Sequence, residues 1–495
     1  MKRYFLLLFC TVLFFVSSPC LSSAGQQKEI EALKKQMEAL KKEYETKFQI
    51  LLEKIEQLKA QQEAKEKQNN ERIRKEVEKV KAVAAEKDEE RKKEIIELKS
   101  ALEEQKKRSI LAGFDGKHFT LGSEDGNFKL NIGGYMQTDY RYYEGGEDEN
   151  NKNTFDIRRA RLTASGNMFK NIKYKLQTDF SDEDDELRDA YVDIDYTPLA
   201  IVRAGQFKVP FGYEQTTSST TFDFIERSVA GNFIASTSRD IGVMLFGSLF
   251  ENRMKYYLGA FNGTGENSTD DNDSLTFIGR LLFSPFTNDK DSLLKGLTFG
   301  GSFSGGDREA HSSRAITLAA RNKISNTVTV NGQRTRAAAE ARYFKGPFSL
   351  KGEYYYQREE RNDISGRDFE DLITQGFYGI ATYVLTGEEK IDGKNIVPTH
   401  NFNPKTGDWG AFELAARYSY FDLDKANGSD PVIENENVSA NTIQGFTFGL
   451  NWYFNKYLKL MADYSFYDFD QQENLSHPSI GDSTNQFTAR LQVKF

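Results

Sequence analysis

Cysteine, histidine, proline and long apolar runs are scarce in this sequence, and most of these absences exclude a class of protein. The two cysteines, Cys10 and Cys20, lie near the N-terminus and the four histidines are scattered, so a disulfide scaffold, a zinc site and a thiol nucleophile are excluded. After Val16 no apolar run approaches the roughly 20 residues of a membrane helix, which excludes a helical membrane protein. The net charge of -8 argues against a nucleic-acid partner. No nucleophile and base are paired, so we expect no enzyme, metal or cofactor.

The first 24 residues have the layout of a secretory signal peptide. The basic residues Lys2 and Arg3 precede the apolar stretch Tyr4–Val16, and small residues lead to an expected cleavage point after Ala24. The apolar stretch is too short for a membrane anchor. We therefore expect residues 1–24 to be removed and the mature chain to be exported without any cysteine.

Residues 25–110 are predicted to form a coiled coil. Gly25 to Arg108 contains 23 basic and 20 acidic residues in 84 positions, with no proline and no further glycine. Apolar residues recur three and four positions apart, beginning at Ile30, Leu33, Met37, Leu40 and Tyr44. Such a seam needs partner helices to bury it, although a solvated single helix is the alternative. Residues 111–126 are assigned to a linker.

From Gly113 onward the apolar period changes to two, and 37 of the 38 glycines lie in this region. In the last nine residues, apolar Phe487, Ala489, Leu491, Val493 and Phe495 alternate with polar neighbours, as in a β-strand. Sixteen such segments begin near Asn127, Asn153, Lys170, Arg188, Ala200, Arg239, Arg253, Ser274, Leu297, Thr335, Phe348, Gln375, Trp409, Thr442, Tyr457 and Gln486.

Three features favour a membrane barrel over a soluble sandwich. The segments have the roughly 9–11 residues of a membrane strand, whereas soluble strands average about 5–6. Full charges recur on the polar face, as a water-filled lumen permits. Short links alternate with long polar ones, such as Arg141–Lys152 and Asp422–Asn441.

Residues 127–495 are therefore predicted to form an all-β transmembrane barrel of about 16 antiparallel strands. It would lie in the outer membrane of a Gram-negative-type cell, in contact with its lipid and with the coil in the periplasm. One link, Thr386–Asp408, is long although it falls on the side of the short turns. Either it is an ordered periplasmic excursion or a strand pair has been miscounted.

Several spaced motifs resemble the phosphate-selective porin O/P family. They occur in order between about Gly122 and Phe495 and include Phe155–Leu162 (FDIRRARL), Leu187–Phe211 (LRDAYVDIDYTPLAIVRAGQFKVPF), Tyr383–Glu388 (YVLTGE), Gly410–Tyr420 (GAFELAARYSY) and Gly449–Phe454 (GLNWYF). The resemblance implies a trimeric porin whose long third loop, near residues 210–238, folds into the lumen. It also implies arginines along the lumen that guide anions, with lysines at the constriction.

Strand alternation assigns a set of basic residues to the lumen. Because a guanidinium presents several donors in a fixed fork, such residues suit phosphate oxygens. The candidates are Arg159, Arg161, Lys173, Lys175, Arg203, Arg227, Arg239, Arg253, Lys255, Arg336, Arg342, Lys351 and Arg417. The alternative interpretation is that they pair with lumen carboxylates and only stabilise the wall.

The expected constriction loop is acidic, which leaves the preferred ion open. Pro210–Ser238 carries a net charge of -2 and no lysine, and hydroxyl residues occupy much of it. Its candidate pore residues are Tyr213, Thr216, Ser218, Thr220, Asp223 and Glu226. We expect a porin for small hydrophilic solutes, with anions such as phosphate as candidates. The alternative is a general or cation-preferring porin that mainly tethers the envelope through cell-wall contact of its coil.

Overall fold

The computed structural model describes residue 54 and residues 91–102, 110–143, 153–181, 187–235, 238–270, 272–289, 291–312, 329–364, 366–424, 442–470 and 483–495. Contacts divide the chain into two units, Met1–Glu103 and Glu104–Phe495. In the first unit residues 91–102 are helical. The predicted signal peptide and most of the predicted coiled coil lie outside the described residues. No helix among the described residues is both long and apolar enough to cross a membrane.

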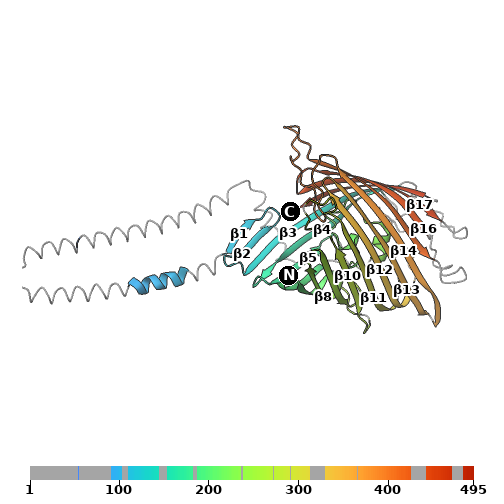
Figure 1. The fold of residues 1–495 in the computed structure, drawn as a ribbon, viewed down its shortest axis with the longest axis horizontal. Coiled ribbons are helices and arrows are strands. Elements are labelled where there is room, and N and C mark those ends of the chain that lie inside the picture. The colour runs from blue at the N-terminus through green and yellow to red at the C-terminus, as the bar shows by residue number, and fades with distance from the viewer. Residues whose placement is uncertain are drawn as a thin grey trace, which may run out of the picture. The chain divides into compact units, whose positions relative to one another are not determined.

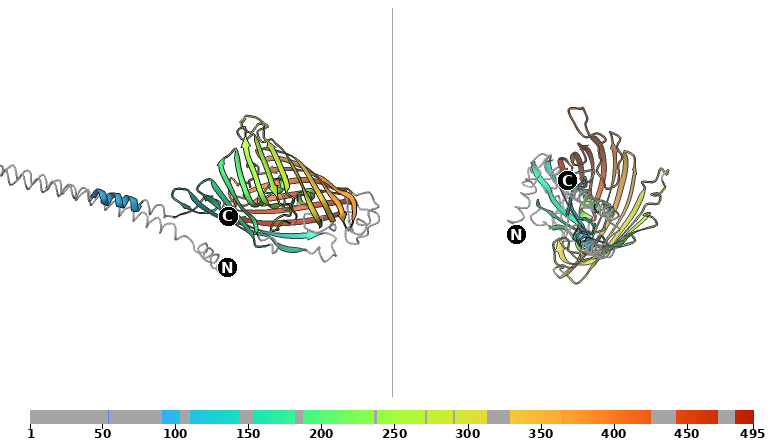
Figure 2. Two further views of the ribbon diagram at one scale, coloured as in Figure 1. Left: turned by 90° about the horizontal axis from the view of Figure 1, so that it is seen from below. Right: turned by 90° about the vertical axis from the view of Figure 1, so that its left-hand side faces the viewer.

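The second unit is a closed barrel of sixteen antiparallel strands, which confirms the barrel part of the predicted fold (Figures 1 and 2). Each strand pairs with the next along the chain, and the last pairs with the first to close the wall. The strands are β3 (Phe128–Tyr143), β4 (Thr154–Met168), β5 (Ile172–Asp179), β6 (Leu187–Thr197), β7 (Ala200–Lys208), β8 (Arg239–Leu249), β9 (Met254–Phe261), β10 (Thr276–Phe283), β11 (Thr298–Ser312), β12 (Thr329–Lys345), β13 (Phe348–Ile364), β14 (Arg367–Val384), β15 (Ala411–Asp424), β16 (Thr442–Tyr453), β17 (Leu458–Asp470) and β18 (Ser483–Lys494).

A two-stranded hairpin precedes the barrel, within the region that the sequence assigned to a linker. It consists of β1 (Ile110–Phe114) and β2 (Phe119–Ser123), and β2 pairs with the first residues of β3. The rest of β3, from Tyr135 to Tyr143, pairs with β18. The first residues of β3 extend beyond the part that pairs with β18, so β2 of the hairpin can pair with them. The hairpin lies next to β3 in Figure 1.

The wall has its apolar side outward and its polar side inward, the reverse of a soluble protein. On β16, Phe446 and Phe448 are 49% and 58% exposed, whereas Thr447 between them is 1% exposed. The exposed fraction alternates in this way along β13 and β16, as the period of two requires. An apolar outer face and a charged inner face are the arrangement of a barrel that crosses a bilayer.

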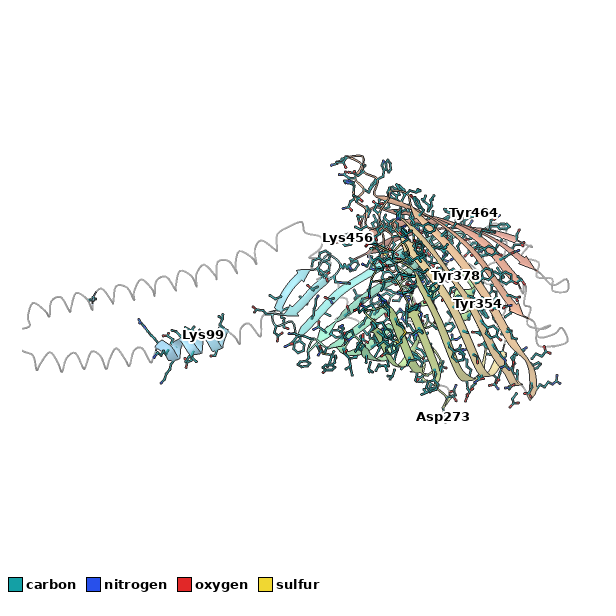
Figure 3. The ribbon with its side chains drawn as sticks, viewed as in Figure 1. Lys99, Asp273, Tyr354, Tyr378, Lys456 and Tyr464 are labelled. Carbon is teal, nitrogen blue, oxygen red and sulfur yellow. The ribbon has the colours of Figure 1, made fainter. Side chains whose placement is uncertain are left out.

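Most connections are shorter at one end of the barrel than at the other. Residues 198–199 and 346–347 are two-residue turns at one end, whereas residues 262–275 form a longer loop at the other. Lys456 and Asp273, labelled in Figure 3, mark a short turn and that longer loop. Two exceptions are the long connection 284–297 at the first end and the short connection 365–366 at the second. The long link that seemed misplaced in the sequence, residues 385–410, joins β14 to β15 at the short-turn end, so it is an ordered excursion and no strand pair is missing.

The largest buried apolar cluster lies inside the barrel, between one loop and the wall. Residues 209–238, which connect β7 to β8 and are called here the inner loop, carry the short helices α4 (Tyr213–Thr216) and α5 (Val229–Ile234). Phe233 of α5 packs edge-on against Phe421 of β15, with ring centroids 5.3 Å apart. This packing fixes α5 to the inner face of β13–β15.

Candidate permeation pathway

The inner loop begins with a sharp turn that is held by one wall carboxylate. Gly212 has a φ of 72°, a conformation that favours glycine, and a Cβ there would lie 2.8 Å from Glu353. Glu353 of β13 accepts hydrogen bonds from the backbone N–H groups of Tyr213 and Glu214. The hydroxyls of Tyr355 and Tyr378 donate to the same carboxylate at 2.6 and 2.8 Å. The start of the loop is thus anchored to one side of the wall.

The middle of the loop is anchored through Glu226, which binds arginines of three wall strands. Its carboxylate lies 2.8 Å from Arg158 of β4, 3.4 Å from Arg141 of β3 and 3.5 Å from Arg490 of β18. Burial alone would raise the pKa of the Glu226 carboxyl, but the guanidinium groups of Arg158, Arg159 and Arg490 hold that pKa well below its usual value. Glu226 is therefore an anion whose charge is neutralised by arginines of the barrel wall.

The two other loop carboxylates also face the wall. Asp223 forms ion pairs with Lys351 of β13 and with Lys390 of the 385–410 link. Glu214 accepts hydrogen bonds from the backbone and the hydroxyl of Ser228 and lies 3.7 Å from Arg417 of β15. None of the three acids of the loop lines the cavity in the opposite half of the lumen.

That opposite half contains a cavity of about 430 Å³ between the inner loop and strands β3–β10. Six cationic side chains line it, with one carboxylate, Asp189. The cations are Arg161, Lys175, Arg203, Lys208, Arg239 and Arg280. The loop contributes the hydroxyl residues Thr216, Ser218 and Ser219 to this side. The loop therefore separates charge, since its acidic side meets the wall and its hydroxyl side meets the cavity.

The basic side chains of the cavity are partly neutralised by carboxylates of the barrel strands. Arg161 pairs with Asp179 at 2.6 Å, and Lys175 and Arg239 share Asp189 at 2.5 and 2.7 Å. Arg203 binds Asp193 and Arg280 binds Glu340, each through two hydrogen bonds. Lys208 instead donates to the backbone carbonyls of Gln215 and Thr217. Six basic side chains thus face four carboxylates, so basic groups outnumber acidic ones around the cavity.

Several inward arginines keep hydrogen-bonding capacity beyond these wall pairs. Within the described part of the chain, seven have at least one buried N–H with no protein acceptor: Arg141, Arg159, Arg280, Arg334, Arg336, Arg342 and Arg417. A buried donor without a partner is costly, so such groups favour water or an anion that reaches them. Pairing with the wall therefore does not use up their donors.

Comparison with known proteins identifies this architecture. The model of the family described as phosphate-selective porin O and P matches residues 130–495. The chain belongs to this family. Porin O of Pseudomonas aeruginosa is 25% identical over 408 residues, which cover 76% of this chain and 90% of Porin O. The trimer form of OmpT, an outer-membrane protein of Vibrio cholerae, aligns over 74% of this chain and 99% of its own with a TM-score of 0.50 and 12% identity, a likeness of fold.

The chain is accordingly an outer-membrane porin. The porin's cavity collects four of the candidates from sequence, Arg161, Lys175, Arg203 and Arg239, together with the loop residues Thr216 and Ser218. No three His, Cys, Asp or Glu side chains gather as a metal site among the residues that the structure describes.

The remaining candidates lie elsewhere in the porin. Five contact residues of the inner loop. Three stack on its aromatic rings: Arg336 lies over Phe211, Arg342 over Tyr213 and Arg417 over Phe224. Lys351 pairs with Asp223, and Arg227, itself in the loop, donates to the carbonyl of Glu214. Arg159 donates to Gln137, and Lys173 pairs with Asp195 near the short-turn end. Arg253 lies in the turn before β9 and Lys255 near the start of β9, both exposed. The hydroxyl of Thr220 accepts from Lys494.

Alternation missed basic residues that the porin does bring to its inner loop. Arg158 is an extra residue at a β-bulge opposite Gln137 and Thr138, so both Arg158 and Arg159 reach inward. Lys208 is five positions from Arg203, so strict alternation would put it on the other face. The φ of 127° at Gly205 interrupts the regular strand between them. Arg280 lies on a face that alternation can assign, but its neighbours on that face, Ile278 and Leu282, are apolar and made the face read as lipid-facing.

Proposed function

We propose that this porin preferentially conducts small anions, with oxyanions of the phosphate type as its preferred solutes. The observation that carries the proposal is the cavity on the hydroxyl side of the inner loop, where six cations outnumber four carboxylates. The family description and the similarity to Porin O agree with this class of solute.

The mechanism is facilitated diffusion. A positive cavity raises the local anion concentration, because low-dielectric walls focus the field. Guanidinium forks and the Thr216 and Ser218 hydroxyls can replace the hydration shell of an oxyanion. Since many donors are shared along the wall, the anion moves between similar sites and is not held in one deep well.

Planar-bilayer recordings of the purified porin test this proposal. A KCl gradient should give a reversal potential that favours chloride, and added phosphate should reduce the chloride current. Lys208→Met is the informative variant, because Lys208 donates to the backbone carbonyls of Gln215 and Thr217 and its loss strands no carboxylate. It should weaken phosphate block, while Lys295→Met, in the turn before β11, should not. A reversal potential that favours potassium, with no phosphate block, would instead support the general or cation-preferring porin.

We further propose a homotrimer whose N-terminal segments associate in the periplasm as a coiled coil. Ile96 and Leu98 in the helical residues 91–102 are 65% and 62% exposed, so they need a partner to be buried. The name of the OmpT structure describes that protein as a trimer. Deleting residues 26–108 should weaken the attachment of the outer membrane to the cell wall and leave conductance intact. Unchanged attachment would remove the tether role.

A further inference from the structure

The long link between β14 and β15 contacts the inner loop through Lys390 and Asp392, although most of the link is exposed. Lys390 of this link is only 4% exposed, although it lies in a connection at the short-turn end. Its ammonium group binds Asp223 of the inner loop at 2.8 Å and Glu413 of β15. The backbone N–H of Lys390 donates to the carbonyl of Gly346, in the turn between β12 and β13. One residue thus connects the inner loop with two parts of the wall.

A second contact lies two residues further along. Asp392 accepts a hydrogen bond from the hydroxyl of Tyr213 at 2.9 Å and pairs with Arg342 of β12 at 2.5 Å. Tyr213 opens α4, whereas Asp223 lies near the middle of the inner loop. The link therefore holds the inner loop at two separate points, Tyr213 and Asp223.

The link is itself fixed to the barrel wall, so it can hold the inner loop in place. Ile396 is buried with Val384, Ala411 and Tyr453 in a small apolar cluster of its own. Further along, the backbone N–H of Phe402 donates to the carbonyl of Phe454 at 2.7 Å. Because the link is pinned after Lys390 and leaves β14 at Val384 shortly before it, the segment loses little extra freedom when it also binds the loop.

We infer that residues 385–410 are a brace for the inner loop and that Lys390 is its positioning residue. Asp223 is held by Lys351 from the wall and by Lys390 from the link, so its carboxylate cannot turn towards the passage. Without Lys390, Asp223 would keep one partner and the loop around it would lose its contact with the link. The brace thus keeps both the shape of the constriction and the separation of charge across the loop.

Single-channel recordings of four variants test the brace. Lys390→Met should produce transient closures of the open pore about tenfold more often than in the unchanged porin, because a charge-assisted contact of the loop is lost. Lys390→Arg keeps the charge and should behave like the unchanged porin. Lys394→Met, an exposed lysine of the same link, is the matched control and should also leave the current steady.

The fourth variant separates positioning from simple stabilisation. Lys390→Met also strands the carboxylate of Glu413, which would destabilise the barrel whatever the loop does. Lys390→Met with Glu413→Gln removes that charge, so its heat resistance should recover while its closures persist. A steady current in the double variant, whether or not Lys390→Met alone shows closures, would overturn the inference. The double variant also carries the test if the single variant fails to insert.

Discussion

Placing a negative charge on the hydroxyl side of the inner loop should reverse the preference of the pore. Ser218 is exposed to the cavity, and its hydroxyl hydrogen-bonds within the loop, to the side chain and the backbone N–H of Thr220. Ser218→Glu can therefore be accommodated with little repacking. Ser218→Gln has nearly the same size without the charge and is the matched control.

The magnitude follows from Coulomb's law in a partly screened site. A unit charge about 8 Å from a passing ion contributes about 2 kcal/mol at an effective dielectric constant of about 20. Screening at physiological ionic strength reduces this to about 0.8 kcal/mol, since the Debye length is also about 8 Å. The added negative charge destabilises an anion in the pore by this energy and stabilises a cation by the same amount. The anion-to-cation permeability ratio should therefore fall about tenfold.

Reversal potentials in a KCl gradient measure this ratio directly. Ser218→Glu should shift the potential towards that of potassium, and Ser218→Gln should leave it unchanged. The shift should diminish in concentrated salt, because screening shortens the reach of the charge. Equal potentials for the two variants would show that Ser218 does not face the ion pathway, and would refute the division of the loop into acidic and hydroxyl sides.

Two further predictions concern the anchoring of the inner loop. Glu226→Gln should lower the free energy of unfolding by about 3 kcal/mol, because it leaves Arg158 without its anion, and Glu389→Gln, an exposed change, should not. Because the pKa of Glu226 is held below its ordinary value of 4.5, its stabilisation is complete above about pH 4.5 and is lost as the pH falls further. Urea unfolding in lipid should therefore show the gap between wild type and Glu226→Gln closing in acid; a constant gap would contradict the charged state. Phe233→Ala removes the contact with Phe421 and should cost about 3 kcal/mol in the same assay, with a noisier open current; a steady current would show that α5 is held by its other contacts.

Local pattern was sufficient to predict the barrel. The solvent on each face of a membrane strand dictates residue polarity position by position, so the period of two is written directly in the chain. All sixteen strands lie at segments read from that pattern, and the outward Phe446 and Phe448 obey it. The start of β14 was read eight residues late, at Gln375 instead of Arg367, because Phe369, Asp371 and their neighbours alternate poorly. The coiled coil and the signal peptide remain predictions.

The site depended on pairings that are distant in sequence. The loop's net charge of -2 suggested an electronegative constriction, yet Asp223 and Glu226 bind residues more than sixty positions away in either direction. A one-residue bulge turned Arg158 inward, which no alternation rule can foresee. The two lysines that pair with Asp223, Lys351 and Lys390, come from the wall and from the link, far from the loop in sequence.

By itself the sequence determined that this chain closes into a membrane barrel, because each residue's polarity reports the solvent that its face meets. Only the tertiary structure decided which way the charges of the inner loop point. Direction depends on which cations surround each carboxylate, and those cations come from strands and links far apart along the chain.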